Sequence, residues 1–220
     1  MRVIITGGTG LIGSALAQDL AAAGYEVIVL SRQPEGKSLP AGVRAEKWDG
    51  KTAVSWGHLA DGAEAIINLA GESIGGSGLL PARWTKARKQ RILNSRLDAG
   101  KAVVEAVSAA AVKPRVVVQS SGIDYYGNVP EAVVTEASPP GKDGFLANVT
   151  IDWEASTAAV EAQGVRRVII RTGLVLAESG SSLDTIALPF KLHVGGPVGN
   201  GKQWLSWIHR QDEIQAIRFC

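Results

Sequence analysis

The sequence has few of the residues that form disulfides and metal sites. Its 220 residues include one cysteine, Cys220, and three histidines, His58, His193 and His209, whose spacing resembles no metal site. We therefore expect neither a disulfide nor a bound metal. No apolar run approaches the roughly 20 residues of a membrane span, and the first predicted strand starts at Arg2, which leaves no room for a targeting peptide. The expected protein is cytoplasmic and has no membrane partner.

An excess of charge of one sign is also missing. The 23 Lys+Arg and 21 Asp+Glu residues are interspersed and give a formal net charge of +2. Such a balance indicates neither a nucleic acid nor an anionic membrane surface as a partner. Hydrophobic residues make up 45% of the chain and charged residues 20%, which is ordinary for a globular protein. The expected partner is a small-molecule substrate.

The sequence does contain a regular alternation of apolar runs and helical patterns. The runs are continuously apolar, as expected for parallel strands that are covered on both faces. They lie at 3–5, 25–30, 43–48, 65–70, 115–119 and 166–171. Amphipathic helical patterns lie between them, the longest over 82–111 and another over 146–163. This alternation predicts an α/β fold with a doubly wound parallel sheet in the strand order 3-2-1-4-5-6.

A glycine-rich turn, Thr6-Gly-Gly-Thr-Gly-Leu-Ile-Gly13, follows the first apolar run. In such turns one glycine makes the bend, one lets backbone approach a pyrophosphate, and one permits close packing of a helix on a strand. The turn stands between a predicted strand and a predicted helix, whose N–H groups and dipole favour phosphate. It therefore predicts a Rossmann dinucleotide site. The expected contacts are Gly7, Gly10, Leu11, Ile12 and Gly13.

The end of the second predicted strand indicates which dinucleotide binds. A protein that prefers NAD has an acidic residue there for the ribose 2′-hydroxyl, whereas this chain has Ser31-Arg32. A hydroxyl and a guanidinium suit a 2′-phosphate, and no acid repels it. We predict NADP as the cofactor, the alternative being that Arg32 is a solvent-facing arginine.

The predicted cofactor site divides the chain. We expect an NADP-binding domain over residues 1–177 and a small, partial substrate-side lobe over residues 178–220. No repeat or low-complexity linker is present. Three stretches rich in glycine and proline, at 73–81, 138–144 and 195–201, are interpreted as functional loops.

Several motifs in one order carry a resemblance that spans the whole chain. They are the glycine turn, Ser31-Arg32, Asn68-Leu-Ala-Gly-Glu72, Arg83-Trp84, Ser95-Arg96, Tyr125-Tyr-Gly127, Trp153-Glu154, Arg171-Thr-Gly173, Gly195-Gly-Pro-Val-Gly-Asn-Gly201, Gln203, Trp207-Ile-His209 and Asp212. In this order they resemble the short-chain dehydrogenase/reductase superfamily. More narrowly, the chain resembles an atypical extended branch that is described as sugar-nucleotide epimerase-like or as a cell-division inhibitor group, and it is shorter than that branch at the C-terminus.

The resemblance implies further cofactor contacts. Leu69, Ala70 and Gly71 would pass the adenine ribose, although a strand end that packs on a helix is an alternative reading. Val175 would lie against the nicotinamide ribose. Two arginines of the long helix, Arg91 and Arg96, are further expected contacts, and a solvated helix face is the alternative for both.

The same resemblance implies a Ser, Tyr and Lys catalytic set, of which only the serine is found. Ser121 follows the fifth strand and is the candidate catalytic residue, with Ser120 as its neighbouring alternative and a strand-capping role as the competing reading. The Tyr-x-x-x-Lys pair would fall on Leu146 and Thr150, or one residue earlier on Phe145 and Val149. Threonine supplies no cationic field to lower a tyrosine pKa from about 10. The usual mechanism therefore cannot be assigned.

Other polar groups remain as candidates, each with a structural alternative. Tyr125 and Tyr126 could act as acids, although paired loop tyrosines more often pack together. Glu72 could face the cleft or be a solvated carboxylate, and His209 could shape the substrate side or be a hydrogen-bonded structural histidine.

The functional hypotheses follow from this incomplete set. One is an NADP-dependent oxidoreductase or epimerase of atypical mechanism acting on a small carbonyl compound or nucleotide sugar. Another is a non-catalytic NADP(H)-sensing regulatory protein of cell or plastid division, and a third is a catalytically dead fragment. Family members continue beyond the position of Asp212, so we expect a fragment or a reduced lobe whose pocket is open or is closed by a second subunit in a homodimer. Residues 178–202 are the expected substrate surface.

Overall fold

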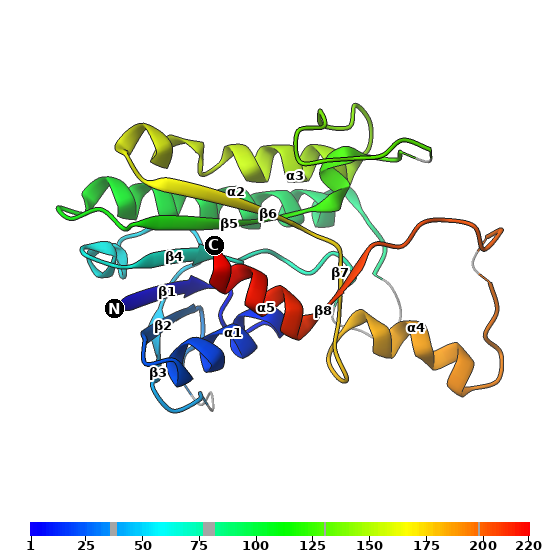
Figure 1. The fold of residues 1–220 in the computed structure, drawn as a ribbon, viewed down its shortest axis with the longest axis horizontal. Coiled ribbons are helices and arrows are strands. Elements are labelled where there is room, and N and C mark those ends of the chain that lie inside the picture. Colours follow the sequence, from blue (N-terminus) through cyan, green and yellow to red (C-terminus); the bar gives the residue numbers. More distant parts are fainter. Residues whose placement is uncertain (36–38, 77–81, 130, 198) are drawn as a thin grey trace.

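A parallel sheet of six strands organises the protein. The computed structural model describes residues 1–35, 39–76, 82–129, 131–197 and 199–220. Within it the strands are ordered β3-β2-β1-β4-β5-β6, and each neighbouring pair is parallel (Figure 1). Their bounds are β1 Arg2–Thr6, β2 Glu26–Ser31, β3 Val43–Lys47, β4 Ala65–Asn68, β5 Val116–Gly122 and β6 Arg166–Thr172. The predicted α/β class and the strand order 3-2-1-4-5-6 are confirmed.

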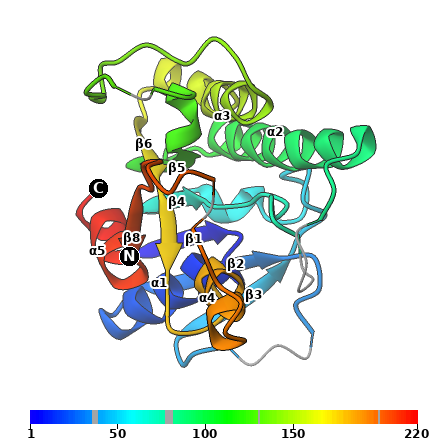
Figure 2. The same cartoon turned by 90° about the vertical axis from the view of Figure 1, so that its right-hand side faces the viewer.

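Helices cover both faces of this sheet, as Figures 1 and 2 show. The first face is covered by α1 (Leu11–Ala22) and α5 (Arg210–Phe219), and the second by α2 (Lys86–Ala109) and α3 (Phe145–Ala155). Three short 3-10 helices, η1 (Gly57–Ala60), η2 (Ile123–Tyr126) and η3 (Ala158–Gln163), complete the large layer structure.

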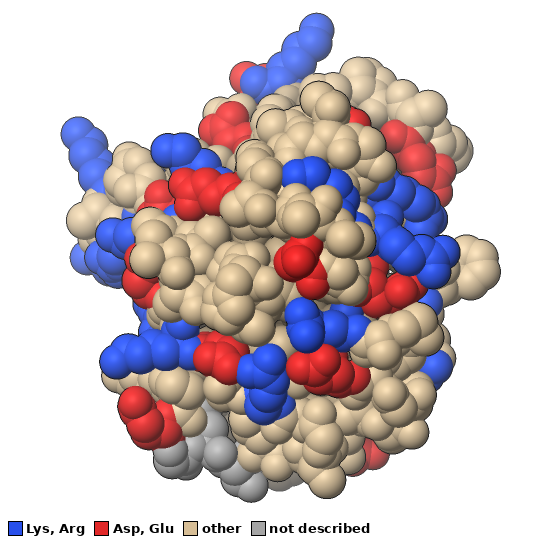
Figure 3. Space-filling model, turned by 90° about the vertical axis from the view of Figure 1, so that its left-hand side faces the viewer, with Lys and Arg blue, Asp and Glu red and all other residues tan. Residues whose placement is uncertain are grey.

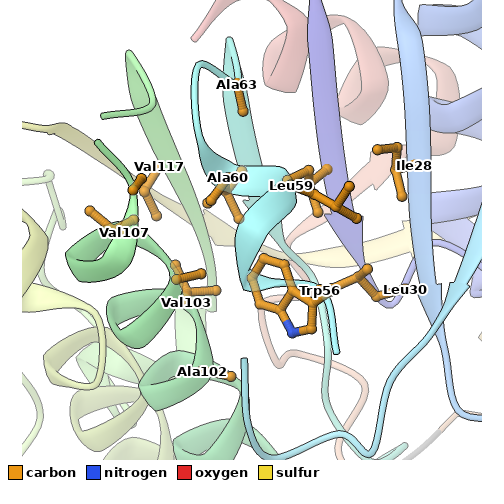
Figure 4. Packing of buried hydrophobic residues seen from close by; sticks show 14 of the residues in the cluster. Ile28, Leu30, Trp56, Leu59, Ala60, Ala63, Ala102, Val103, Val107 and Val117 are labelled. Carbon is orange, nitrogen blue, oxygen red and sulfur yellow. The ribbon is translucent and has the colours of Figure 1, made fainter. Parts of the chain in front are cut away.

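Each face of the sheet has its own apolar core because successive side chains of a strand point to opposite sides. In β2, Ile28 and Leu30 join the core beside α2, and Val27 and Val29 join the core beside α1. Trp56 is completely buried, and Figure 4 shows it between the strands and α2. The continuous apolar runs seen in the sequence are therefore explained by burial on both faces.

The two long helices are shorter than the sequence pattern suggests. Helix α2 begins at Lys86 rather than at residue 82, because the Thr85 hydroxyl accepts a hydrogen bond of 3.3 Å from the Arg88 amide and caps it. Helix α3 ends at Ala155, and η3 follows in place of a continuous helix. The Ser156 hydroxyl donates to the Trp153 carbonyl at 2.6 Å, and such back-bonding competes with the helical amide pattern.

The segment between β6 and α5 forms structure that the sequence did not indicate. Strands β7 (Leu174–Leu176) and β8 (Trp207–His209) pair in parallel, and α4 (Ser182–Lys191) lies between them in the chain. The expected loop at 178–202 thus contains a helix. Figures 1 and 2 place α4 beyond the carboxyl ends of the large sheet. Its apolar residues Leu183, Ile186 and Phe190 are all exposed, so the described residues leave this stripe uncovered.

Helix α5 returns to the large sheet and packs on α1. Ile214 and Ile217 are buried in the same core as Val3 and Ile5 of β1. The expected lobe over 178–220 therefore has two parts with different surroundings. Helix α4 lies beyond the large sheet, whereas α5 packs against it. The division at residue 177 stays a prediction.

Charges of both signs alternate on the face that Figure 3 shows, at the amino ends of the strands. Two of its ion pairs are Arg2 with Glu26 at 3.2 Å and Arg115 with Glu64 at 2.8 Å. This face therefore presents no extended field of one sign.

Candidate functional site

The glycine turn lies where β1, β4 and α1 meet, and its glycines are there because no side chain would fit. Gly7 has a φ of +69°, and a Cβ on it would lie 2.8 Å from the Leu69 carbonyl oxygen. A Cβ on Gly13 would overlap the Gly7 carbonyl oxygen and would lie 2.7 Å from the Gly8 Cα. The structure thus brings the glycine turn and the segment after β4 into contact. The roles of Gly7, Gly10, Leu11, Ile12 and Gly13 toward a cofactor stay predictions.

The first turn of α1 is open to an anion. Gly10 is its N-cap and no side chain caps the helix, and the first turn contains no acidic residue. The amide of Gly10 is bonded to the Gly7 carbonyl at 3.0 Å, which fixes the bend before the helix. The unpaired amides that follow, with the positive end of the helix dipole, suit a pyrophosphate.

Buried polar side chains tie together the strand ends beneath this turn. The Thr6 hydroxyl donates to the Asn68 amide oxygen at 2.6 Å, and the Asn68 amide nitrogen donates to the Gln119 amide oxygen at 2.9 Å. All three side chains are completely buried. Thr6 also accepts a hydrogen bond from the Ala70 amide at 3.1 Å. This network fixes the carboxyl ends of β1, β4 and β5 relative to one another.

Ser31 and Arg32 at the end of β2 differ in their surroundings. Ser31 is buried, and its hydroxyl accepts a hydrogen bond of 3.2 Å from the Gln33 amide. Arg32 is exposed, and its stem passes Gly50, where a Cβ would lie 3.6 Å from the Arg32 Cδ. Within the described part of the chain, no hydrogen bond or ion pair engages the Arg32 guanidinium. Its charge is therefore available at the strand end.

Arg96 does not lie on a solvated helix face, so the alternative reading for this residue is wrong. It is 6% exposed, and its Nη1 donates to the carbonyl oxygens of Glu72 at 3.1 Å and Ile92 at 3.0 Å. Its guanidinium lies 4.7 Å from the centre of the Trp153 ring. Burial lowers the pKa of Arg96 to about 10, and the nearby Glu72 carboxylate opposes this shift, so the side chain stays cationic at neutral pH.

The neighbouring side chains complete the attachment of the loop after β4. The Ser95 hydroxyl accepts a hydrogen bond of 2.8 Å from the Glu72 amide. Arg91, whose side chain is 58% exposed, pairs with the Glu72 carboxylate at 3.3 Å. A Cβ on Gly71 would lie 3.0 Å from the Arg96 Cζ. Arg96 and Ser95 therefore position this loop, while contacts of Arg91, Arg96, Leu69, Ala70 and Gly71 with a cofactor stay predictions.

We expect Arg96→Leu to destabilise the protein by about 2 kcal/mol, because it leaves two carbonyl oxygens without a charged donor. Urea unfolding monitored by circular dichroism measures this change. Arg91→Leu removes an exposed ion pair on the same helix and is the matched control, with an expected effect below about 1 kcal/mol. Equal effects of the two substitutions would contradict the positioning role of Arg96.

Ser121 is engaged by a buried charge network rather than open to solvent. It is 5% exposed, and its hydroxyl donates to the Glu154 carboxylate at 2.6 Å. Arg171 donates to both oxygens of the same carboxylate, from Nε at 2.8 Å and from Nη2 at 2.9 Å. These hydrogen bonds hold the pKa of Arg171 above its usual range. The catalytic role of Ser121 stays a prediction, and its hydroxyl proton is already shared with Glu154. Ser120 is half-buried beside it.

The two tyrosines pack on this network. The Arg171 guanidinium lies 3.6 Å from the centre of the Tyr125 ring, and its Nη1 donates to the Tyr126 hydroxyl at 2.8 Å. The two rings meet edge to face at 5.3 Å. Tyr126 also lines a cavity of about 440 Å³, and residues 138–143 of the expected loop line it too. The packing interpretation of the pair therefore fits its contacts, and one loop expected to be functional borders a cavity.

The expected positions of the Tyr-x-x-x-Lys pair lie on α3. Thr150 is buried, and its hydroxyl donates to the carbonyl oxygens of Leu146 at 3.0 Å and Ala147 at 2.8 Å. Neither it nor Leu146 can supply the missing chemistry. A residue that the sequence analysis missed lies close by. Asp124 of η2 is exposed, and its Oδ2 would lie 3.5 Å from a Cβ on Gly122.

The remaining candidates lie on β7 and β8. Val175 is half-buried and pairs with Ile208 across the small sheet, and its contact with a cofactor stays a prediction. The Nδ1 atom of His209 accepts a hydrogen bond of 3.3 Å from the Gln211 amide and caps α5. The structural reading of His209 therefore agrees with its geometry. No group of three or more His, Cys, Asp or Glu residues in the described ranges could hold a metal, and no helix of those ranges is long and apolar enough to cross a membrane.

Comparisons with known proteins agree with this arrangement. The model of the NAD-dependent epimerase/dehydratase family matches residues 3–220. The epimerase family protein YfhF of Bacillus subtilis is 36% identical over 229 residues, which cover 100% of this chain and 70% of that protein. The human epimerase family protein SDR39U1 is 36% identical over 217 residues, which cover 96% of this chain and 67% of that protein.

Solved structures give the same picture. The crystal structure of human SDR39U1 with NADPH matches 99% of this chain and 69% of that chain, with a TM-score of 0.82 and 33% identity. MoeE5 in complex with UDP-glucuronic acid and NAD covers 99% of this chain and 71% of that chain, with a TM-score of 0.76 and 23% identity. At that lower identity the likeness shows the fold alone.

Proposed function

Because the chain belongs to the NAD-dependent epimerase/dehydratase family, we propose that it binds NADP(H) and acts as an atypical short-chain dehydrogenase/reductase. Its substrate would be a small carbonyl compound or a nucleotide sugar. The observation that carries the proposal is the glycine turn, in which side chains are excluded at Gly7 and Gly13, combined with a free guanidinium at Arg32. The similar human protein was crystallised with NADPH, which supports the choice of phosphate-bearing cofactor.

The described residues fit such a cofactor. The amides of the glycine turn and of the first turn of α1 would hold the pyrophosphate, and Arg32 with the Ser31 hydroxyl would hold the 2′-phosphate. Leu69, Ala70 and Gly71 would border the adenine ribose. Arg91 would reach the phosphates from α2, Val175 would border the nicotinamide ribose, and Arg96 would act by holding the loop after β4. A bound nicotinamide would supply or accept a hydride. Residues 1–177 would form most of this site, with 178–220 on the substrate side.

Arg32→Ala tests the nucleotide preference. We expect it to weaken NADPH binding by about 30-fold, because one charge-assisted contact to the 2′-phosphate contributes about 2 kcal/mol. NADH binding should change by less than about threefold, because NADH has no 2′-phosphate. Titration of nucleotide fluorescence measures both affinities. Lys101→Ala, an exposed change of the same charge on α2, is the matched control. Equal losses for NADPH and NADH would remove the 2′-phosphate role.

Turnover tests the enzymatic part of the proposal. NADPH oxidation would be followed across a panel of aldehydes, ketones and nucleotide sugars, at protein concentrations where the cofactor is fully bound. We expect turnover of at least one carbonyl class. Bound NADPH that no member of the panel oxidises would count against an oxidoreductase.

One observation favours a second function. The hydroxyls of Ser121 and Thr150 are both engaged within the protein, and no tyrosine or lysine stands at 146 or 150. This would suit a non-catalytic protein that senses NADP(H) and binds a partner of the division machinery. Such a protein should bind NADPH without turnover. The amount of a defined partner that it captures should differ between samples with and without NADPH. Capture that does not depend on NADPH would exclude the sensing role.

A further inference from the structure

The junction between β5 and α3 lacks the side chains that would normally move a proton there. Leu146 is apolar, and Thr150 directs its hydroxyl into its own helix. Gly122, the last residue of β5, faces this helix, because a Cβ on it would lie 3.6 Å from the Thr150 Cγ2. Ser121, one residue earlier, is turned toward Glu154. None of these four residues therefore offers a free acid or base.

Asp124 supplies a carboxyl at this same junction. Its Oδ2 would lie 3.5 Å from a Cβ on Gly122, which itself lies against Thr150. This separation is an ordinary van der Waals distance, so the carboxyl lies directly beside the end of β5. Asp124 forms no ion pair among the residues that the structure describes. Unlike Glu154, it is exposed, so a substrate can reach it.

The surroundings of Asp124 favour the protonated acid. Partial desolvation raises the pKa of its carboxyl, opposed only by its own backbone amide. On the neighbouring elements, Arg171 of β6 is held by Glu154 of α3, and Asp152 of α3 is exposed. On η2 itself, the Tyr126 hydroxyl accepts from Arg171.

We propose that Asp124 is the catalytic proton-transferring group of this site, in place of the missing tyrosine and lysine. The proposal rests on the proposed oxidoreductase function and specifies its substrates as small compounds with a carbonyl or a secondary hydroxyl group. In reduction, the Asp124 carboxylic acid gives its proton to the substrate oxygen as a hydride supplied by the reduced nicotinamide adds to the carbonyl carbon. The substrate leaves as an alcohol, and the Asp124 carboxylate regains a proton from water. In oxidation the carboxylate accepts the hydroxyl proton.

Two artificial substrates distinguish an effect of Asp124 on proton transfer from an effect on substrate binding. Reduction of 4-nitrobenzaldehyde develops an alkoxide, which is about as basic as hydroxide and far more basic than a phenolate. Reduction of 9,10-phenanthrenequinone develops a phenolate-like oxygen, with a pKa of about 10. The aldehyde therefore needs a general acid far more than the quinone does.

We expect Asp124→Asn to lower kcat for 4-nitrobenzaldehyde by about 100-fold and kcat for the quinone by less than about 10-fold. The wild-type aldehyde rate should fall as pH rises through the pKa of Asp124, and the variant should lose this dependence. Asp152→Asn, an exposed change on α3, is the matched control. Equal losses with both substrates, or an unchanged aldehyde rate, would overturn the assignment.

A titration without turnover gives an independent readout. The Asp124 carboxyl would be followed by carbon-13 NMR in the protein loaded with NADP⁺ and with NADPH, using Asp124→Asn to assign its signal. If the carboxyl faces the nicotinamide, the positive charge of the oxidised ring should lower its pKa relative to NADPH by at least half a unit. Identical midpoints would refute the placement. A protein that binds neither nucleotide would overturn the proposed function instead. Failure of the Asp124 assignment and failure of the proposed function therefore give different results.

The same shift predicts how stability depends on pH. The folded-state pKa of Asp124 lies above its ordinary value near 3.8, so its protonated form stabilises the fold at low pH. That contribution is lost as pH rises through the folded-state pKa. The melting temperature of Asp124→Asn relative to wild type should therefore rise between pH 4 and pH 7. A constant difference across this range would show that Asp124 titrates normally.

Discussion

Replacing Glu154 by alanine is expected to destabilise the protein by about 3 to 5 kcal/mol, because it leaves a charged group without its partner in a largely buried site. The Glu154 carboxylate accepts hydrogen bonds from the Ser121 hydroxyl and from the Nε and Nη2 atoms of Arg171. Glu154 is 6% exposed. Among the described residues, Arg171 would keep only the Tyr126 hydroxyl and the Glu136 carbonyl as acceptors. Because the network joins β5, α3 and β6, the loss should extend to all three elements.

Urea unfolding of Glu154→Ala, followed by circular dichroism, measures this loss. Glu161→Ala is the matched control, since Glu161 pairs with Arg167 at 3.0 Å but its side chain is 55% exposed. An exposed pair of this kind contributes about 1 kcal/mol or less. A loss for Glu154→Ala as small as that of the control would show that Arg171 and Ser121 find other partners.

Replacing Gly13 by alanine is expected to weaken NADPH binding by about 100-fold or more, a change of about 3 kcal/mol. The new Cβ would overlap the Gly7 carbonyl oxygen and lie 2.7 Å from the Gly8 Cα, both of which are backbone atoms. Helix α1 would have to move away from β1, and the amides of its first turn would move with it. Overpacking of this kind also destabilises by about 1 to 3 kcal/mol.

Gly75→Ala is the control for this substitution, because nothing lies within 4 Å of a Cβ at Gly75 and its φ is not in the left-handed region. Nucleotide fluorescence measures affinity, and thermal unfolding measures stability. An affinity loss larger than the stability loss would locate the effect at the cofactor. If Gly13→Ala bound NADPH normally, the glycine turn could not be the pyrophosphate site.

The parts of the fold that were predicted correctly depend on local patterns. The strand order followed from alternating apolar runs and helices, since parallel strands need a crossover between them. The small sheet of β7 and β8 was missed because each strand has three residues, and their partners are about 33 positions apart in register. The end of α3 was missed because a single serine hydroxyl competes with the helix there.

The candidate site divides in the same way. Arg32 was identified from its place after β2, which a sequence shows directly. The hydrogen bond of Ser121 to Glu154 could not be predicted from the sequence. Glu154 lies 33 residues away and is held in place by Arg171 of another strand. Asp124 was overlooked because only the contact between Gly122 and Thr150 shows that it stands at the junction of β5 and α3. An acidic residue two positions after a strand-end glycine was the available signal.

By itself the sequence determined the α/β class, the strand order and the glycine turn, because apolar periodicity and the freedom of glycine act over a few neighbouring residues. Only the tertiary structure decided which polar groups are free and which are engaged. It placed the Arg96 charge inside the protein, committed Ser121 to Glu154, and left Arg32 and Asp124 open at the carboxyl edge of the sheet. Hydrogen bonds between residues that are distant in the chain make that distinction, and folding alone brings such residues together.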